Sequence, residues 1–226
     1  MRWTESSRGK DSEVIEMQTR TEDETVSDVG EAEKGLVIER RFTSAGSDPF
    51  DAFDWIEMNV EIRNPDGSLA HEIEGARLPS GFAGVAGKVC AQKYLRKAGV
   101  PAALRKVAED GVPVWLQRSE PDREKLQTLD SEDRYVGETD GRELFRRLAG
   151  TWTYWGWNYG YFASEADARA YYDEMCYLIA SQRSAPNSPQ WFNTGLNWAY
   201  GITGPAQGHH YIDGTTGGLH LSEDAY

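Results

Sequence analysis

Hydrophobic and polar residues alternate with a period of two near the end of the first quarter of the chain. The apolar positions are Ile56, Met58, Val60 and Ile62, and polar residues lie between them. This alternation predicts a strand with one buried face. Asn64-Pro65-Asp66-Gly67 follows, and it favours a turn because proline presets φ and glycine accepts positive φ. Residues 68–74 can return as a second strand, so the pattern predicts a β-hairpin.

From Phe82 the apolar residues recur at helical spacing instead. The expected stripe consists of Val85 and Val89 with Ala86, Cys90 and Tyr94. A helix there presents Lys88, Lys93 and Arg96 on its outer face. Gly99 and Pro101 are stop signals, so we expect the helix to end before them.

Two further helices are predicted in the second half of the chain. One begins at Asp140, where Glu143 completes a capping box. Its apolar stripe is Leu144, Phe145, Leu148, Ala149 and Trp152. The other begins at Ser164, with Asp167 reaching back to the cap, and is expected to stop at Pro186 and Pro189. Its stripe is Tyr171, Met175 and Leu178 with Tyr172, Cys176 and Ile179.

The remaining segments carry weaker signals. Residues 113–133 are polar with scattered apolar anchors, which indicates an irregular connection. After Asn193 the chain is rich in glycine, histidine and threonine, which is typical of a loop or a short strand. Together these elements predict an α+β fold, mainly helical, with one β-hairpin.

Residues 1–35 form a separate region by composition. Residues 1–34 carry ten acidic and five basic side chains and few large apolar ones. Such a segment buries too little surface to offset its ordering entropy, so we expect a disordered acidic tail and order from about Leu36. An alternative hypothesis is an interaction protein that uses this tail, which predicts a partner lost when residues 1–34 are deleted.

The net charge of −13 narrows the classes of function that the chain can have. It disfavours a nucleic-acid-binding surface, which needs clustered lysine and arginine, but it allows a nucleotide pocket with a few local donors. No apolar run is long enough to cross a bilayer, and the N-terminus lacks a secretory signal. Cys90 and Cys176 are far apart and favour two reduced, buried thiols. We therefore expect a cytoplasmic protein without membrane contact.

Three conspicuous features carry weak evidence for chemistry. The aromatic run between Trp152 and Phe162 can stack on sugars as a binding module, but core packing between helices explains it more simply. His209-His210 with Asp213 lacks the further ligands of a zinc site, so we predict no metal. The glycine-rich residues 214–218 lack the ending of a phosphate-binding loop.

The most informative segment is Ser184-Ala185-Pro186-Asn187-Ser188-Pro189-Gln190-Trp191-Phe192-Asn193-Thr194-Gly195. Two prolines stiffen the exit from a helix, and Ser188 lies between them. Trp191 and Phe192 are expected to anchor the chain in a core. A serine held on such an exit, near free backbone amides, can hydrogen-bond a ribose or a phosphate, although the pattern alone also fits a structural turn.

The segment from Gln182 to Asn193 resembles the one that leads into the catalytic barrel of class II, vitamin B12-dependent ribonucleotide reductases. The shared pattern is Asn-Ser-Pro, a variable residue, then Trp-Phe-Asn. Upstream, Val89-Cys90-Ala91-Gln92-Lys93-Tyr94-Leu95-Arg96 is similar to a helix of that family's N-terminal domain. Pro186 and Gln190 stand where many members have apolar residues, which indicates a subgroup.

The resemblance implies that residues 36–192 form the N-terminal domain and that residues 193–226 begin a ten-stranded α/β barrel. It implies reduction of ribonucleotides to deoxyribonucleotides through a thiyl radical generated with adenosylcobalamin, a cofactor held mainly by the barrel. It also implies a homodimer as a possible assembly. Ser188 takes the family's substrate-contacting role. The redox cysteine is expected beyond Tyr226, so residues 1–226 alone are expected to be inactive and to need the remainder of the barrel.

Overall fold

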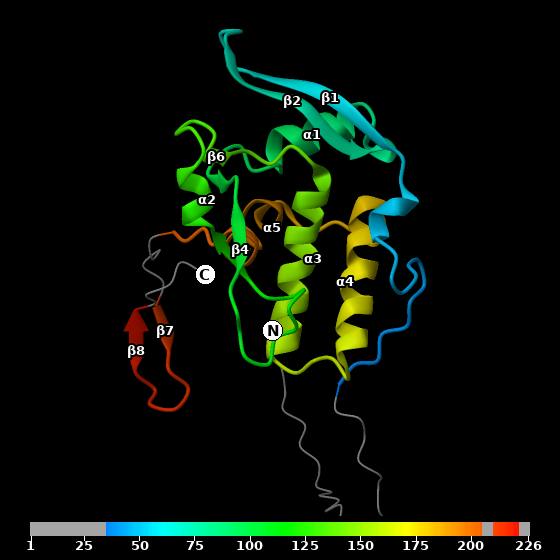
Figure 1. Cartoon of the computed structure of the whole chain (residues 1–226), viewed down its shortest axis with the longest axis vertical. Coiled ribbons are helices and arrows are strands. Elements are labelled where there is room, and N and C mark those ends of the chain that lie inside the picture. The colour runs from blue at the N-terminus through cyan, green and yellow to red at the C-terminus, as the bar shows by residue number, and fades with distance from the viewer. Residues whose placement is uncertain (1–34, 205–209, 222–226) are drawn as a thin grey trace, which may run out of the picture. The chain divides into compact units, whose positions relative to one another are not determined.

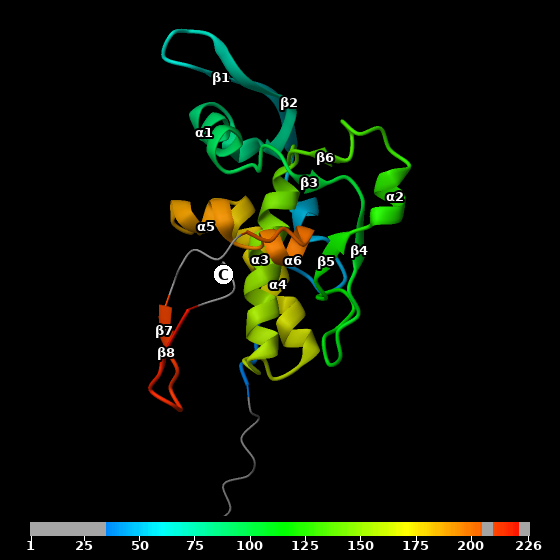
Figure 2. The same cartoon turned by 90° about the vertical axis from the view of Figure 1, so that its left-hand side faces the viewer.

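The computed structural model describes residues 35–204 and 210–221 (Figures 1 and 2). The helices are α1 (Val85–Lys93), α2 (Arg123–Gln127), α3 (Gly141–Asn158), α4 (Glu165–Ala180), α5 (Ser188–Asn193) and α6 (Leu196–Tyr200), with short 3-10 helices at Pro49–Ala52 and Ser80–Phe82. The strands are β1 (Trp55–Arg63), β2 (Leu69–Pro79), β3 (Val100–Pro101), β4 (Leu104–Lys106), β5 (Ser119–Pro121), β6 (Tyr135–Val136), β7 (His210–Ile212) and β8 (Leu219–Leu221). The strands pair as β1–β2, β3–β6, β4–β5 and β7–β8.

The predicted hairpin is present as the antiparallel pair β1–β2. In its turn the Gly67 N–H donates to the Asn64 carbonyl at 2.9 Å, and Gly67 has a φ of +85°. Val60 is buried while its neighbours in the strand are exposed, as the alternation predicted. The return strand runs beyond the predicted residues 68–74 because Ala76 and Leu78, both fully buried, continue the pairing to Pro79.

Helix α1 is present, but it ends earlier than predicted, and of the predicted apolar stripe only Cys90 is fully buried within it. The helix ends at Lys93, and Gly99 and Pro101 lie beyond it, so they do not terminate it. Val85 is 78% exposed. The buried face consists of Gly87, Cys90 and Ala91. Gly87 packs so closely on β1 that an added Cβ would lie 2.6 Å from the Met58 methyl carbon, and this contact sets which face turns inward.

Helix α3 begins as predicted. The Asp140 carboxylate accepts from the Arg142 N–H at 2.8 Å, and the Glu143 carboxylate accepts from the Asp140 N–H at 3.2 Å, which completes the capping box. The predicted apolar stripe is buried, except that Trp152 is only partly covered.

Helix α4 also begins as predicted and ends by another mechanism. The Asp167 N–H donates to the Ser164 hydroxyl at 3.2 Å. The helix stops at Ala180, well before Pro186, and Gln182 follows with a φ of +57°. The left-handed residue, and not the two prolines, therefore ends α4, while Pro189 lies in the first turn of the next helix.

Helix α3 is the central element of the fold. It packs against α4 along its length and also contacts β2, α5 and α6 (Figure 1). The main core contains Phe50, Val60, Ile73, Ala76, Leu78, Phe82, Cys90, Ala91, Leu95, Leu144, Phe145, Leu148, Ala149, Cys176, Ile179, Ala180 and Trp191. Since this core joins the hairpin, α1, α3, α4 and α5, the position of α5 is fixed by the whole domain.

Two segments expected to be irregular contain short elements. Helix α2 and strand β5 lie within residues 113–133. After Asn193 the chain forms α6, which lies between Gly195 and Gly201, both left-handed. The glycines that suggested a loop therefore cap a helix. The expected short strand does occur, in the β7–β8 hairpin. The segment predicted to be a disordered tail, residues 1–35, lies outside the described residues except for Gly35.

Residues 36–43 are tied to α4 mainly by carboxylates. The Ile38 N–H donates to Asp167 at 2.8 Å, and the Thr43 N–H and hydroxyl donate to Glu174 at 2.8 and 2.6 Å. Arg40 pairs with the buried Asp173 at 2.8 Å. These contacts attach the first described segment to the domain.

Candidate functional site

Ser188 lies at the exposed start of α5. The Asn187 side chain caps this helix by accepting from the Gln190 N–H at 3.4 Å. Pro189 fits the first turn because it has no N–H to satisfy there. Ser188 is exposed, so its hydroxyl is open to a ligand.

The tryptophan of the segment anchors α5 to the core. Trp191 is 6% exposed and stacks on Tyr94 with ring centroids 5.0 Å apart. It also meets the edge of Phe145 at 6.4 Å. The predicted second anchor is wrong, because Phe192 is 40% exposed and is not part of the core, although its ring lies 5.7 Å from that of Tyr94.

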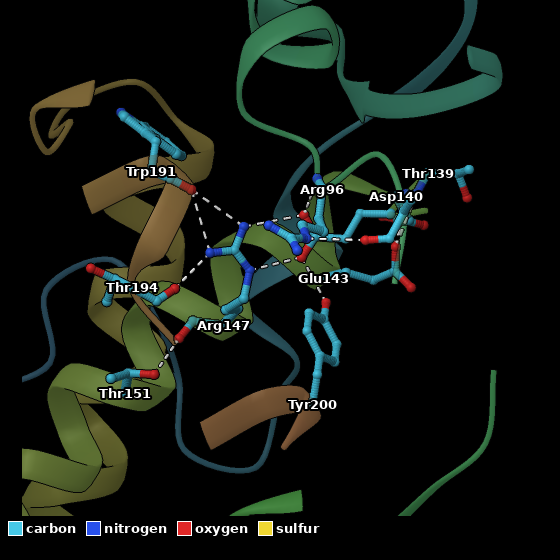
Figure 3. A network of polar contacts seen from close by, with 11 residues as sticks. Arg96, Thr139, Asp140, Glu143, Arg147, Thr151, Trp191, Thr194 and Tyr200 are labelled. Atoms are coloured by element: carbon cyan, nitrogen blue, oxygen red, sulfur yellow. Dashed lines mark hydrogen bonds and ion pairs between the residues drawn. The ribbon is translucent and has the colours of Figure 1, made fainter. Parts of the chain in front are cut away.

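A buried arginine on α3 holds the C-terminal end of α5 (Figure 3). Arg147 is 1% exposed, and its Nη1 donates to the Thr194 carbonyl at 2.6 Å. Nη2 donates to the Trp191 carbonyl at 3.3 Å. Carbonyls at a helix C-terminus lack partners within the helix, so a guanidinium there satisfies them and opposes their partial negative charge.

Glu138 balances the charge of Arg147. Its carboxylate accepts from Arg147 Nε at 2.8 Å and from Nη2 at 3.1 Å, in the bidentate geometry that suits arginine. It also accepts from the Arg96 N–H at 2.8 Å and the Tyr200 hydroxyl at 2.7 Å. Burial, and then the negative charge of Glu138, raise the pKa of Tyr200, which therefore remains a neutral donor.

Two glycines bring the chain after α5 into direct contact with α3. A Cβ on Gly195 would lie 2.4 Å from the Arg147 carbonyl oxygen. A Cβ on Gly150 would lie 2.1 Å from the ring of Trp198. The α5–α6 corner, residues 194–195, is thus held by the arginine, by backbone contact and by the inserted indole.

The two cysteines do not belong to this site. Both are free and buried, as predicted. Burial, and then the charge of Glu138, raise the pKa of Cys90 to about 12. Burial also raises the pKa of Cys176. Neither thiol is ionised at neutral pH, so neither is an activated nucleophile.

The other segments singled out in the sequence lie apart from one another. In the aromatic run, core packing does not account for Trp155, Tyr159 and Tyr161, which are 49%, 74% and 58% exposed. His209 lies outside the described residues and His210 begins β7. Asp213 accepts from the N–H groups of residues 215 and 216 and so shapes the β7–β8 turn, which contains the glycine-rich residues 214–218. Within the described ranges, no three His, Cys, Asp or Glu side chains are grouped to hold a metal ion.

Sequence reasoning missed Arg147 and Glu138. A signal was available, because Arg147 lies beside Leu148 and one turn before Thr151 on the inward part of α3, where an unpaired charge is costly. The sequence did not show which carboxylate would be the partner, since Glu138 precedes the helix and reaches Arg147 from a loop.

Comparison with known proteins gives consistent matches. A family model described as class II vitamin B12-dependent ribonucleotide reductase matches residues 56–182. Proteins named vitamin B12-dependent ribonucleotide reductase from Bradyrhizobium diazoefficiens and Agrobacterium fabrum are each 53% identical over 189 residues, which is 84% of this chain and 15% of theirs. A protein of that name from Streptomyces avermitilis is 32% identical over 168 residues, covering 74% of this chain and 14% of its own.

These relatives are ribonucleotide reductases. This is the class in which a segment similar to the one that contains α5 leads into the catalytic barrel. The chain belongs to the class II vitamin B12-dependent ribonucleotide reductase family and corresponds to its N-terminal region. The family predicted from the sequence is thereby confirmed, and the sugar-binding alternative gains no support. The chain spans about 15% of the length of these relatives. In the described part of the chain, no helix has the length and apolarity needed to cross a membrane.

Proposed function

We propose that this chain is the N-terminal part of an enzyme that reduces ribonucleotides to deoxyribonucleotides for DNA synthesis. The observation that carries the proposal is the α5 segment of the family motif, which is capped by Asn187 and clamped at its other end by Arg147. Such a segment holds an exposed hydroxyl in a fixed place before any ligand arrives, which is the condition for selective binding.

In this proposal Ser188 contacts the ribonucleotide. Its hydroxyl can donate one hydrogen bond and accept two, which suits a ribose hydroxyl or a phosphate oxygen. The clamp prevents α5 from tilting, and Trp191 prevents it from rotating, so the hydroxyl keeps its direction. The role of this chain is to bind and orient substrate, and catalytic residues are expected in the barrel.

The cofactor belongs to the same proposal. Adenosylcobalamin supplies the initiating radical when it is bound. Two cavities among the described residues, about 790 and 830 Å³, have the size of sites for drug-sized ligands, and the cofactor is larger than either, so neither fits it alone. We expect the barrel to hold it. We further expect the complete enzyme to be cytoplasmic and to form a homodimer.

The test is Ser188→Ala in the full-length enzyme. Loss of a hydrogen bond to the substrate predicts an increase in KM of about tenfold, in line with a cost of about 1–3 kcal/mol for an unpaired polar partner. The measurement is steady-state reduction of a ribonucleotide over a range of substrate concentrations.

Ser184→Ala is the matched control. Ser184 is an exposed serine on the same α4–α5 connection, but it precedes the capped helix. We expect its kinetics to equal those of the unmodified enzyme. Unchanged KM and kcat in Ser188→Ala would remove Ser188 from the substrate site.

A further inference from the structure

An apolar groove of about 590 Å³ lies among the first described segment, α3, α4 and the connection into α5. Leu36, Trp155 and Tyr161 line it, together with Pro186 and Gln190. Although the chain carries a net charge of −13, none of the described residues that line this groove is charged. Contiguous exposed apolar surface of this kind marks an interaction site.

The groove is formed before any partner arrives. A Cβ on Gly156 would lie 2.7 Å from the Phe162 ring, so this ring packs directly on the backbone of α3. The Leu36 N–H donates to the Tyr161 carbonyl at 2.7 Å, and the Ala163 N–H donates to the Leu36 carbonyl at 3.0 Å. Because these contacts already fix the lining, a partner binds it without the cost of ordering it.

The aromatic side chains of the groove also offer hydrogen-bond donors. Within residues 35–204 and 210–221, the indole N–H groups of Trp152 and Trp155 and the hydroxyls of Tyr161 and Tyr171 make no hydrogen bond to the protein. Such side chains pack an apolar ring against a partner and donate from its polar end. The groove therefore matches a polypeptide segment with apolar side chains and accessible backbone carbonyls. A charged segment would lose its hydration there and gain no opposite charge.

The groove adjoins the segment that holds Ser188. Pro186 and Gln190, which line the groove, lie two positions before and two positions after Ser188. Arg147 clamps the other end of α5, so Gln190 and the Ser188 hydroxyl belong to one fixed helix. A protein body that shares a substrate with Ser188 therefore comes within reach of the groove.

We propose that this groove is the surface on which the catalytic barrel docks, through an uncharged segment that packs apolar side chains against Trp155 and Tyr161. The inference rests on the proposed function, because that function has Ser188 and the barrel share one substrate. It deepens that function by assigning contact with the barrel to residues of the first segment, α3 and α4, which lie outside the motif around Ser188. The docked segment covers the exposed rings and supplies carbonyls to their donors.

The test is hydroxyl-radical footprinting, in which mass spectrometry measures the oxidation rate of single side chains. Tyr161 and Tyr135 are a matched pair, because they are 58% and 54% exposed and only Tyr161 lines the groove. In the chain of residues 1–226 we expect similar oxidation rates for the two. In the full-length enzyme we expect the rate for Tyr161 to fall by about fivefold or more, since the core of an interface excludes water.

Trp155→Glu in the full-length enzyme tests the chemistry of the contact. A carboxylate in the apolar groove should abolish the protection and return the oxidation rate of Tyr161 to its value in the chain. Tyr135→Glu is the control and should leave Tyr161 protected. Both substituted positions are exposed, so neither substitution removes core contacts.

The proposal is overturned if Tyr161 is oxidised as fast in the full-length enzyme as in the chain, or if Trp155→Glu leaves it protected. Protection that appears in the chain alone and grows with its concentration would assign the groove to a second copy, and would also overturn the proposal. None of these rates depends on ribonucleotide reduction or on Ser188→Ala, so a failure of the docking proposal is distinguishable from a failure of the proposed function.

Discussion

Arg147 is the residue on which the geometry of the site most depends. Its guanidinium spans the Glu138 carboxylate and two carbonyls at the end of α5, entirely out of contact with water. Buried ion pairs are costly to form, and removal of one partner leaves the other charged and unsolvated. The pair therefore specifies one arrangement of α3 and α5 rather than simply adding stability.

We expect Arg147→Met to lower the free energy of unfolding by about 3–5 kcal/mol, because Glu138 and the carbonyls of α5 lose their donor. Urea denaturation of the chain measures this change. Arg63→Met is the control, since Arg63 pairs with Glu61 on the exposed hairpin and should cost no more than about 1 kcal/mol. If the two substitutions lower the free energy of unfolding equally, the buried charge of Arg147 contributes no more to stability than an exposed one.

At the scale of elements, the α5–α6 corner is set by the absence of a side chain at Gly195. Gly195 combines a φ of +85° with direct contact to the backbone of α3. Gly46 has nearly the same φ, +83°, but open space around it. The two glycines therefore separate the cost of backbone conformation from the cost of close packing.

We predict that Gly46→Ala destabilises the chain by about 1 kcal/mol, the cost of a left-handed conformation for a residue with a Cβ. Gly195→Ala should cost a further ~1–3 kcal/mol, because the new methyl group overlaps the Arg147 carbonyl. Thermal unfolding of both variants provides the comparison. If they are equally stable, the corner does not pack on α3 as described.

Element prediction from the sequence succeeded where the signal was local. The hairpin turn, the capping box at Asp140 and the cap at Ser164 each depend on residues within a few positions. It failed for α6, because two flanking glycines also favour a loop, and for part of the buried face of α1, where Gly87 packs against β1. The Arg147 clamp joins segments 44 or more residues apart, and no local pattern contains that information.

At the scale of the whole molecule, the described domain is fastened to its first segment by buried acids on α4. Glu174 accepts from the Phe42 N–H, the Thr43 N–H and the Thr43 hydroxyl. Burial alone would raise the pKa of Glu174, but these hydrogen bonds outweigh burial and lower it. The fold is therefore expected to weaken in acid through this contact.

Proton linkage decides whether this contact stabilises the fold at high or at low pH. A carboxyl with a lowered folded pKa adds stability that is fully present above its unfolded value, about 4.3, and is lost as the pH falls through the folded value. We expect Glu174→Gln to reduce this loss of stability, and Thr43→Val to raise the pKa of Glu174 toward its ordinary range. Urea denaturation between pH 6 and pH 3 measures the pH dependence of stability in Glu174→Gln. Carboxyl-selective NMR titration measures the pKa of Glu174 in Thr43→Val. An unaltered pH profile in Glu174→Gln would contradict the assignment.

For the molecule as a whole, the family was predictable from the sequence, but the exposure of its surface residues was not. The sequence indicated helices around a hairpin, and the resemblance identified the family. The exposure of Trp155 was not foreseen, because a dense aromatic run on a helix ordinarily indicates a core. The ten-stranded barrel, and the division at residues 192 and 193, stay predictions.

The indole of Trp198 occupies the space that a side chain at position 150 would need. The side chains at positions 150 and 198 therefore compete for the same space, and a substitution at one position constrains which residues the other can have. A descendant that acquires alanine or serine at position 150 must give up the large ring at position 198 in the same step or soon after. Positions 150 and 198 are thus expected to covary among homologues. A homologue with a large side chain at position 150 and a small one at position 198 would be one in which α6 packs differently on α3.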